Sequence, residues 1–371
     1  MRVWHWINSL ISEINPRYVL SFLAMGLLAT VFIWLITVKR PKWDRFGYLV
    51  LLIVLIRCLL FGNPWAWDFY RASLSVDDLG WRQQSVVYVE YYKFFKYPGK
   101  KYLAVGSSQT YTLYQEYSQR HPGLTVFNLA GMTPIDFYLY RQYIADRNPQ
   151  YILLYLTEFD LAKEPSLLAA KIAPSLGWDL FRHWPVLYEI SKEAKTELAL
   201  KEIALGELMP EYKYSFIFKG LLQKFSKRNQ ALSIDSLYKE TQPNVEQLAR
   251  GIQGVQRELD EKWISYQAYF LREFLEFCQR RSTKVIVIEG QYNPLVVNEK
   301  TQRLHFLTQQ ALLSLLKEYP LIKYVPKSET LPLTDNDFSD AVHFKKESAL
   351  RFAQDLLDKL DRGLPQSQDG K

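Results

Sequence analysis

Short apolar runs alternate with amphipathic stretches along the last two thirds of the chain. Five of these runs are four to seven residues long and end at polar, glycine or proline residues, which predicts strands over 102–105, 125–129, 151–157, 284–289 and 322–325. Amphipathic stretches follow most of them, and the final stretch places on one helical face Ala349, Phe352, Leu356, Leu357 and Leu360. This alternation predicts an α/β fold, a doubly wound, flavodoxin-like parallel sheet of about five strands with helices on both faces.

The spacing of the strands predicts how the rest of the chain is organised. Residues 160–283 are charged, aromatic-rich and without a strand pattern, so we expect a helical cap inserted between the third and fourth strands. We expect the domain that contains the sheet and the cap over 101–362. A connector rich in tyrosine and tryptophan precedes it over 68–100, and a polar, disordered tail follows over 363–371.

Two apolar runs precede the connector and predict a membrane anchor over 1–67. The first, 18–38, has no charged residue and is long enough to cross a bilayer core about 30 Å thick. The second, 46–62, contains Arg57, whose charge is costly at mid-membrane unless it snorkels to the interface or faces a partner protein. The second run therefore fits a transmembrane helix, a helix at the membrane interface, or a helix packed on the soluble domain.

The net charge of +7 is concentrated in this anchor, where seven basic side chains oppose two acidic ones. The rest of the chain is nearly neutral, so nothing in its charge indicates a nucleic-acid partner. Four basic side chains and one acidic one lie in the short segment 39–45, and the positive-inside rule places such a loop in the cytoplasm. Two spans then put everything after residue 67 outside the plasma (inner) membrane, whereas a single span would put it inside.

Three short motifs at the ends of predicted elements carry candidate chemistry. Ser108 follows the first strand in a Gly-Ser-Ser turn, and ligands of parallel sheets bind where loops leave the carboxyl ends of strands. Gly131 follows the second strand and lets a backbone N–H approach a substrate oxygen closely. Asp340 precedes His343 by three residues, a spacing at which the carboxylate can orient the imidazole that takes a proton from a serine.

Each motif also has a purely structural interpretation. Gly-Ser-Ser fits a turn with a helix N-cap, the aspartate fits a cap on the last helix, and the glycine fits a tight strand–helix turn. Two cysteines exclude a disulfide framework, and no His, Asp and Glu cluster has metal-ligand spacing. No dinucleotide or Walker glycine pattern follows a strand, so we expect neither a metal nor another cofactor.

The order of the three motifs resembles the SGNH (GDSL-like) hydrolase superfamily, roughly from residue 100 to residue 360. The resemblance implies that Ser108 is the nucleophile and that His343 and Asp340 complete a triad with it. It also implies that the backbone N–H groups of Ser108 and Gly131 form the oxyanion hole.

Two motifs depart from that family's pattern. Ser107 stands where the family usually has aspartate, and the third-block Gly-x-Asn-Asp is missing, because the third strand ends in Leu-Thr-Glu-Phe-Asp. An oxyanion hole would then have one donor fewer, and one lost donor costs about 100- to 1,000-fold in rate.

The Gly-Ser-Ser motif, the N-terminal anchor and the long insertion together make this sequence similar to a narrower group. That group is the membrane-anchored SGNH proteins of lipoteichoic acid D-alanylation and polysaccharide acetylation. That branch implies a membrane-bound O-acyltransferase as partner, a lipid bilayer, and an envelope polysaccharide or teichoic-acid-like acceptor. We therefore expect a membrane-anchored, extracytoplasmic O-acyltransferase that moves an acetyl or D-alanyl group through a Ser108 acyl-enzyme. Candidate substrate-binding residues lie at or just after the ends of the second, third and fourth predicted strands: Asn128, Glu158 and Asn293. The alternatives are an esterase or deacetylase with the same triad, and a catalytically idle subunit that scaffolds a membrane complex.

Overall fold

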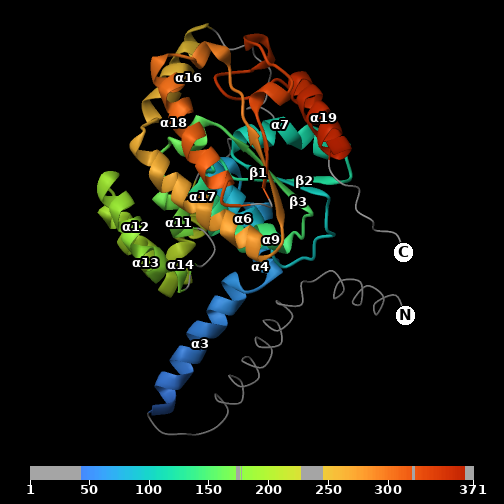
Figure 1. Ribbon diagram of the computed structural model, residues 1–371. Coiled ribbons are helices and arrows are strands. Elements are labelled where there is room, and N and C mark those ends of the chain that lie inside the picture. Colours follow the sequence, from blue (N-terminus) through green and yellow to red (C-terminus); the bar gives the residue numbers. More distant parts are fainter. Residues whose placement is uncertain (1–42, 173–175, 177, 227–244, 320–321, 364–371) are drawn as a thin grey trace, which may run out of the picture. The chain divides into compact units, whose positions relative to one another are not determined.

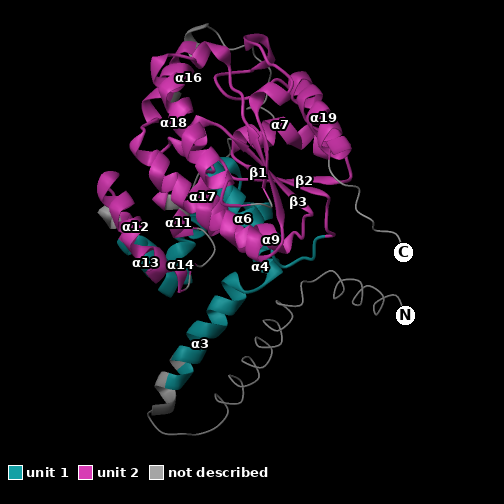
Figure 2. Ribbon diagram, in the orientation of Figure 1, with its two compact units in different colours: residues 1–97, 201–232 teal, residues 98–200, 233–371 magenta. Residues whose placement is uncertain are grey.

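The computed structural model describes residues 43–172, 176, 178–226, 245–319 and 322–363. The predicted first span and most of the predicted tail lie outside these ranges. The chain divides into two compact units, coloured separately in Figure 2. We call Pro98–Leu200 with Ser233–Lys371 the sheet unit, and Met1–Tyr97 with Lys201–Leu232 the helical unit.

The sheet unit contains five parallel strands in the order β2-β1-β3-β4-β5. Their bounds are β1 Tyr102–Gly106, β2 Leu124–Asn128, β3 Tyr151–Leu156, β4 Lys284–Glu289 and β5 Ile322–Val325. The predicted α/β fold with a five-stranded parallel sheet is confirmed. Gly106 pairs with Asn128 at the carboxyl ends of β1 and β2, so the loops that follow these strands start at the same edge of the sheet.

Helices cover both faces of the sheet, as Figure 1 shows. On one face lie α7 (Ser108–Ser118) and α19 (Lys346–Gly363), whose buried side chains share one core with alternate residues of β1 and β3. On the other lie α8 (Pro134–Leu139) and α17 (Lys262–Arg280), which pack against each other. Because both faces are covered, β1 and β3 are buried along their whole length, which explains their continuous apolar runs.

In its described residues, the chain between β3 and β4 consists of helices joined by loops and turns, with one isolated antiparallel bridge between Lys163 and Leu259. Its helices up to α17 are α10 (Glu158–Leu161), α11 (Leu167–Ile172), α12 (Asp179–Glu193), α13 (Glu197–Leu208), α14 (Pro210–Lys213), α15 (Ser215–Ser226) and α16 (Val245–Glu258). After β2, α9 (Arg141–Asp146) continues from α8, and α18 (Glu299–Leu316) joins β4 to β5.

The helical unit is built around the junction of two N-terminal helices, α3 (Trp43–Phe61) and α4 (Pro64–Ser73). Asn63 caps α4 by accepting a hydrogen bond from the Ala66 N–H at 2.9 Å. Trp67 is fully buried and donates from its ring N–H to the Phe61 carbonyl at 2.9 Å. Two further helices, α5 (Val76–Leu79) and α6 (Trp81–Tyr92), follow within the segment expected as a connector.

Helix α3 contains much of the second predicted span. No single described helix is both long enough and apolar enough to cross a membrane. Only the pair Val50–Phe61 and Pro64–Ser73, bent by 53° at the break between them, meets these criteria of length and composition when taken together. Arg57 is one third exposed, and its Nε donates to Glu211 Oε1 at 2.5 Å within the same unit.

Candidate active site

Ser108 lies at the carboxyl end of β1, as the first residue of α7. Ser107 is the N-cap of this helix, and its hydroxyl accepts a hydrogen bond from the Gln109 N–H at 3.4 Å. The capping role therefore falls on Ser107. Gly106 is required just before this turn, because a Cβ at that position would collide with the Thr110 hydroxyl.

The imidazole of His343 joins Ser108 to Asp340. Its Nε2 lies 2.8 Å from Ser108 Oγ, and its Nδ1 lies 2.7 Å from Asp340 Oδ2. The His343 side chain is 29% exposed and the Asp340 side chain 46%, so both residues are accessible to solvent. With this contact on Nδ1, Nε2 is the ring nitrogen that can accept the serine proton.

A tight loop holds Asp340 in place. Its second carboxylate oxygen accepts hydrogen bonds from the Val342 and His343 N–H groups, both at 2.8 Å. Burial works to raise the pKa of Asp340, but the hydrogen bonds from the His343 ring and the two N–H groups outweigh it, so this pKa lies below the ordinary carboxyl value. The Asp340 carboxylate is therefore ionised at neutral pH.

Asn293, a predicted substrate-binding residue, contacts the same loop from the turn after β4. Its Nδ2 donates to the Asp340 carbonyl at 3.1 Å, and its backbone N–H donates to the Ala341 carbonyl at 3.2 Å. Its Oδ1 accepts from the Leu295 N–H at 3.0 Å. The Asn293 side chain is buried, and both its amide nitrogen and its amide oxygen make hydrogen bonds. Here it therefore stabilises the loop that carries Asp340.

Gly131 lies in the turn after β2 with a φ of +63°, a left-handed conformation that favours glycine. It lines the same cavity as Ser108. Neither the Ser108 N–H nor the Gly131 N–H donates a hydrogen bond to another described residue. Two free backbone donors beside a serine hydroxyl are the arrangement that stabilises a developing oxyanion.

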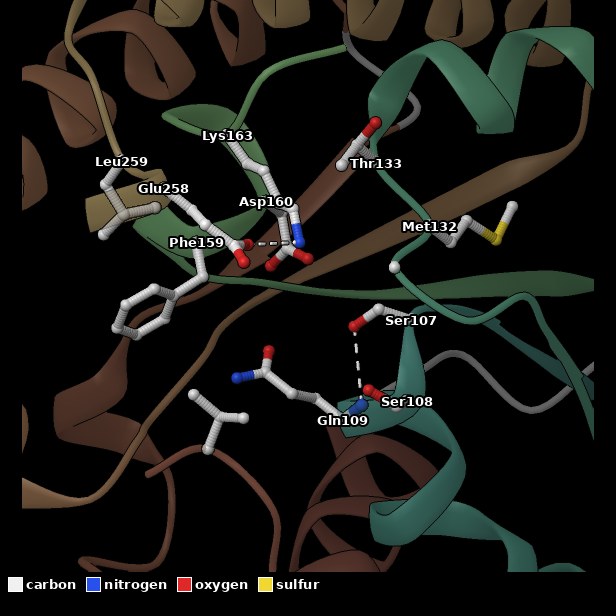
Figure 3. Close-up of a pocket in the computed structure, with 12 residues that line it drawn as sticks. Ser107, Ser108, Gln109, Met132, Thr133, Phe159, Asp160, Lys163, Glu258 and Leu259 are labelled. Atoms are coloured by element: carbon white, nitrogen blue, oxygen red, sulfur yellow. Dashed lines mark hydrogen bonds and ion pairs between the residues drawn. The ribbon is translucent and has the colours of Figure 1, made fainter. Parts of the chain in front are cut away.

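The cavity in front of Ser108 has a volume of about 100 Å³ (Figure 3). Apolar side chains form part of its wall: Met132, Phe159, Leu259 and Val342. Its polar lining includes Gln109, Thr133 and Asp160, together with an ion pair of 2.9 Å between Lys163 Nζ and Glu258 Oε2. The cavity therefore combines an apolar wall with a few polar groups, which is typical of a small-molecule site.

Asp160 is both a helix cap and a cavity residue. Its Oδ2 accepts hydrogen bonds from the Thr157 N–H at 2.8 Å and the Thr157 hydroxyl at 2.9 Å. Burial raises the pKa of Asp160 to about 7, against the lowering effect of these hydrogen bonds.

Two other predicted substrate-binding residues are not among those that line the cavity. Asn128 ends β2, opposite Gly106. Glu158 is buried, accepts a hydrogen bond from the Tyr292 hydroxyl and lies 3.5 Å from His305 Nδ1. Within the described ranges, no group of three or more His, Cys, Asp or Glu side chains could hold a metal ion.

Several lining residues were not predicted. Gln109 carried a signal, because it directly follows the candidate serine, but its amphipathic surroundings did not reveal that it is buried. Glu258 and Leu259 come from the end of α16, and the pairing of Leu259 with Lys163 brings them to the cavity. Nothing in the local sequence indicates that pairing.

No protein-family model matches the chain, and neither does any curated protein. Among solved structures, a chain from Streptococcus pneumonia, which its title provisionally calls a platelet activating factor, has a TM-score of 0.39 and 10% sequence identity. That match covers 80% of this chain and 99% of the other.

Proposed function

We propose that the chain is a serine-dependent acyltransferase that forms an acyl-enzyme on Ser108 and passes the acyl group to a hydroxyl of an envelope polysaccharide or polymer. The observation that supports this most is the continuous chain of hydrogen bonds from Ser108 through His343 to Asp340, at the carboxyl edge of a parallel sheet. A serine, a base and an orienting carboxylate within hydrogen-bond reach are the parts that nucleophilic acyl transfer requires.

In the first half-reaction, Ser108 Oγ attacks the carbonyl carbon of an ester or thioester while its proton passes to His343 Nε2. The carbonyl electron pair moves to oxygen, where the N–H groups of Ser108 and Gly131 stabilise the negative charge. When the carbonyl re-forms, the bond to the leaving group breaks, and the leaving group takes the proton from Nε2. The acyl group is then an ester of Ser108.

In the second half-reaction, an acceptor hydroxyl gives its proton to His343 Nε2 and attacks the acyl-enzyme. Collapse of the second tetrahedral intermediate returns the proton to Ser108 and releases the acylated acceptor. Asp340 stays ionised throughout and stabilises the imidazolium that forms twice.

We further propose that a membrane anchor places this reaction outside the plasma membrane, beside a membrane-bound O-acyltransferase that supplies the acyl group. The basic segment 39–45 supports the orientation, and the apolar run from 18 to 38 supports the anchor. Six apolar side chains of α3 are more than one third exposed, as expected of a helix that meets lipid: Val50, Leu52, Ile53, Val54, Ile56 and Leu59.

The test follows a labelled acyl ester in the presence of the full-length chain in detergent, with and without a polysaccharide or glycerol acceptor. Transfer predicts that label moves to the acceptor and that Ser108→Ala abolishes this. Release of label only to water, whatever the acceptor, would instead identify an esterase or deacetylase. No turnover by a folded sample would identify an idle scaffold subunit.

The topology has a separate test. A single new cysteine at an exposed position of the sheet unit, such as Gln119, should react with a membrane-impermeant thiol reagent in intact cells. Protection of that cysteine until the cells are lysed would put the domain inside and contradict the envelope assignment.

A further inference from the structure

Gln109 is a buried polar side chain without a hydrogen-bond partner among the described residues, directly beside the proposed nucleophile. It is 4% exposed, and neither its Nε2 nor its Oε1 makes a hydrogen bond with a described residue. A buried unpaired carboxamide costs folding stability, and such groups in native proteins call for an explanation. In Figure 3 this carboxamide extends away from Ser108 and into the cavity, on the side of Phe159.

The composition of the cavity wall indicates which part of the substrate it receives. The leaving group and the acceptor must both approach His343, because that imidazole exchanges protons with them. Ser108 and Gly131, which carry the two oxyanion donors, line the cavity, whereas His343 is not among the lining residues. The remaining substituent of the carbonyl carbon is the acyl chain. We therefore expect the acyl chain to enter the cavity that Gln109 lines.

We propose that Gln109 selects acyl groups that carry a hydrogen-bonding substituent, a hydroxyl or an amino group, on the carbon next to the carbonyl. This assignment rests on the proposed acyl-enzyme at Ser108. A hydroxyl can accept from Nε2 or donate to Oε1, and an amino group can donate to Oε1. A volume of about 100 Å³ suits a short chain, and Phe159 and Val342 give the rest of that chain an apolar wall.

The test uses three matched three-carbon substrates, the 4-nitrophenyl esters of lactate, alanine and propionate, with the full-length chain in detergent. The readout is kcat/KM for the lactyl or alanyl ester divided by kcat/KM for the propionyl ester. Comparing this ratio between protein variants cancels the different intrinsic reactivities of the esters. We expect Gln109→Met to lower at least one ratio about tenfold, the effect of one hydrogen bond to a buried group. A fall in the lactyl ratio would indicate recognition of a hydroxyl substituent, and a fall in the alanyl ratio would indicate recognition of an amino substituent.

Two controls separate selection from a structural role. The same substitution at Gln119, exposed at the other end of α7, should leave both ratios at the wild-type value. Gln109→Met and Gln109→Leu should melt no lower than the wild type, because each removes a buried group that has no partner.

The outcomes are distinguishable. Ratios unchanged in both Gln109 variants would overturn the role of Gln109 and leave the acyl-enzyme proposal standing. A fall of several degrees in the melting temperature of both variants with unchanged ratios would likewise assign Gln109 to the fold. A folded wild-type chain that turns over none of the three esters would overturn the proposed function and this assignment with it.

Discussion

His343 Nε2 lies 2.8 Å from Ser108 Oγ, although 235 positions separate the two residues in the chain. Ser108 is fixed by the end of β1 and the start of α7. His343 lies in the loop before α19, and α19 packs on α7. The packing of these two helices therefore brings the imidazole to the hydroxyl.

The carboxylate of Asp340 should matter for catalysis much more than for folding. Asp340→Asn keeps an oxygen that can accept from the backbone N–H groups, but it loses the charge that fixes the tautomer and stabilises the imidazolium. We expect kcat/KM for an activated ester to fall about 1,000- to 10,000-fold. Asp335→Asn, at an exposed position near the same loop, is the matched control and should retain wild-type activity. Equal activity of the two variants would remove Asp340 from the mechanism.

Alanine at Gly131 should be harmful for a conformational reason. The φ of +63° is strained for any residue with a Cβ, by about 1–2 kcal/mol, although no described residue beyond its two chain neighbours comes within 4 Å of the added group. We expect Gly131→Ala to lower both the melting temperature and kcat, because relief of the strain moves the N–H group that we propose as an oxyanion donor.

Gly251→Ala provides the matched control for that variant. Gly251 lies in α16, and outside its own helix turn no described residue comes within 4 Å of the added Cβ. The same substitution in a helix should stabilise by about 1 kcal/mol. Changes of the same sign in the two variants would argue against the left-handed conformation as the cause.

Asn293 should act as a positioning residue. Asn293→Ala removes the hydrogen bond that its side chain donates to the Asp340 carbonyl, so the loop of the carboxylate loosens. We expect kcat to fall about tenfold, with KM little changed, and stability to fall by about 1 kcal/mol. Asn298→Ala is the comparison, since it removes a cap from α18 at a similar stability cost. If both variants lower kcat equally, the effect of Asn293 is general destabilisation.

The raised pKa of Asp160 should make the difference in stability between Asp160→Asn and the wild type depend on pH. Its pKa is about 7 in the folded chain, against an ordinary value of 3.8. Between these values the unfolded chain releases a proton that the folded chain keeps, so this group makes stability fall as pH rises through the window. Asp160→Asn lacks the ionisation, so its melting temperature minus that of the wild type should increase from pH 4 to pH 7.5. A difference that stays constant over this range would contradict the buried carboxylate.

The sheet could be predicted closely because its signal is local. Continuous apolar runs bounded by turn residues gave strands that agree with β4 and β5 at both ends and with β1, β2 and β3 to within one residue. The short Asp-x-x-His spacing likewise predicted a contact within one loop, and His343 Nδ1 does contact Asp340.

The cavity wall was much less predictable, because it depends on where distant segments meet. Gln109 lines the cavity together with residues from other loops, and one of them, Leu259, pairs with Lys163 far from it in the sequence. Asn293 follows a strand as predicted, but its hydrogen bonds to the loop of Asp340 depend on tertiary packing. The pattern of apolar residues predicts where a strand ends, but it does not predict which residues the side chains at that end contact.

The most direct test of the central claim is labelling with a fluorophosphonate, which reacts with an activated serine. An acyl-enzyme mechanism at Ser108 predicts one phosphonyl group per wild-type chain, mapped to Ser108 by peptide mass spectrometry. The same labelling is expected for Ser107→Ala, and none for Ser108→Ala or His343→Ala. A folded wild-type chain that stays unlabelled, or a label that survives Ser108→Ala, would contradict an acyl-enzyme at this residue.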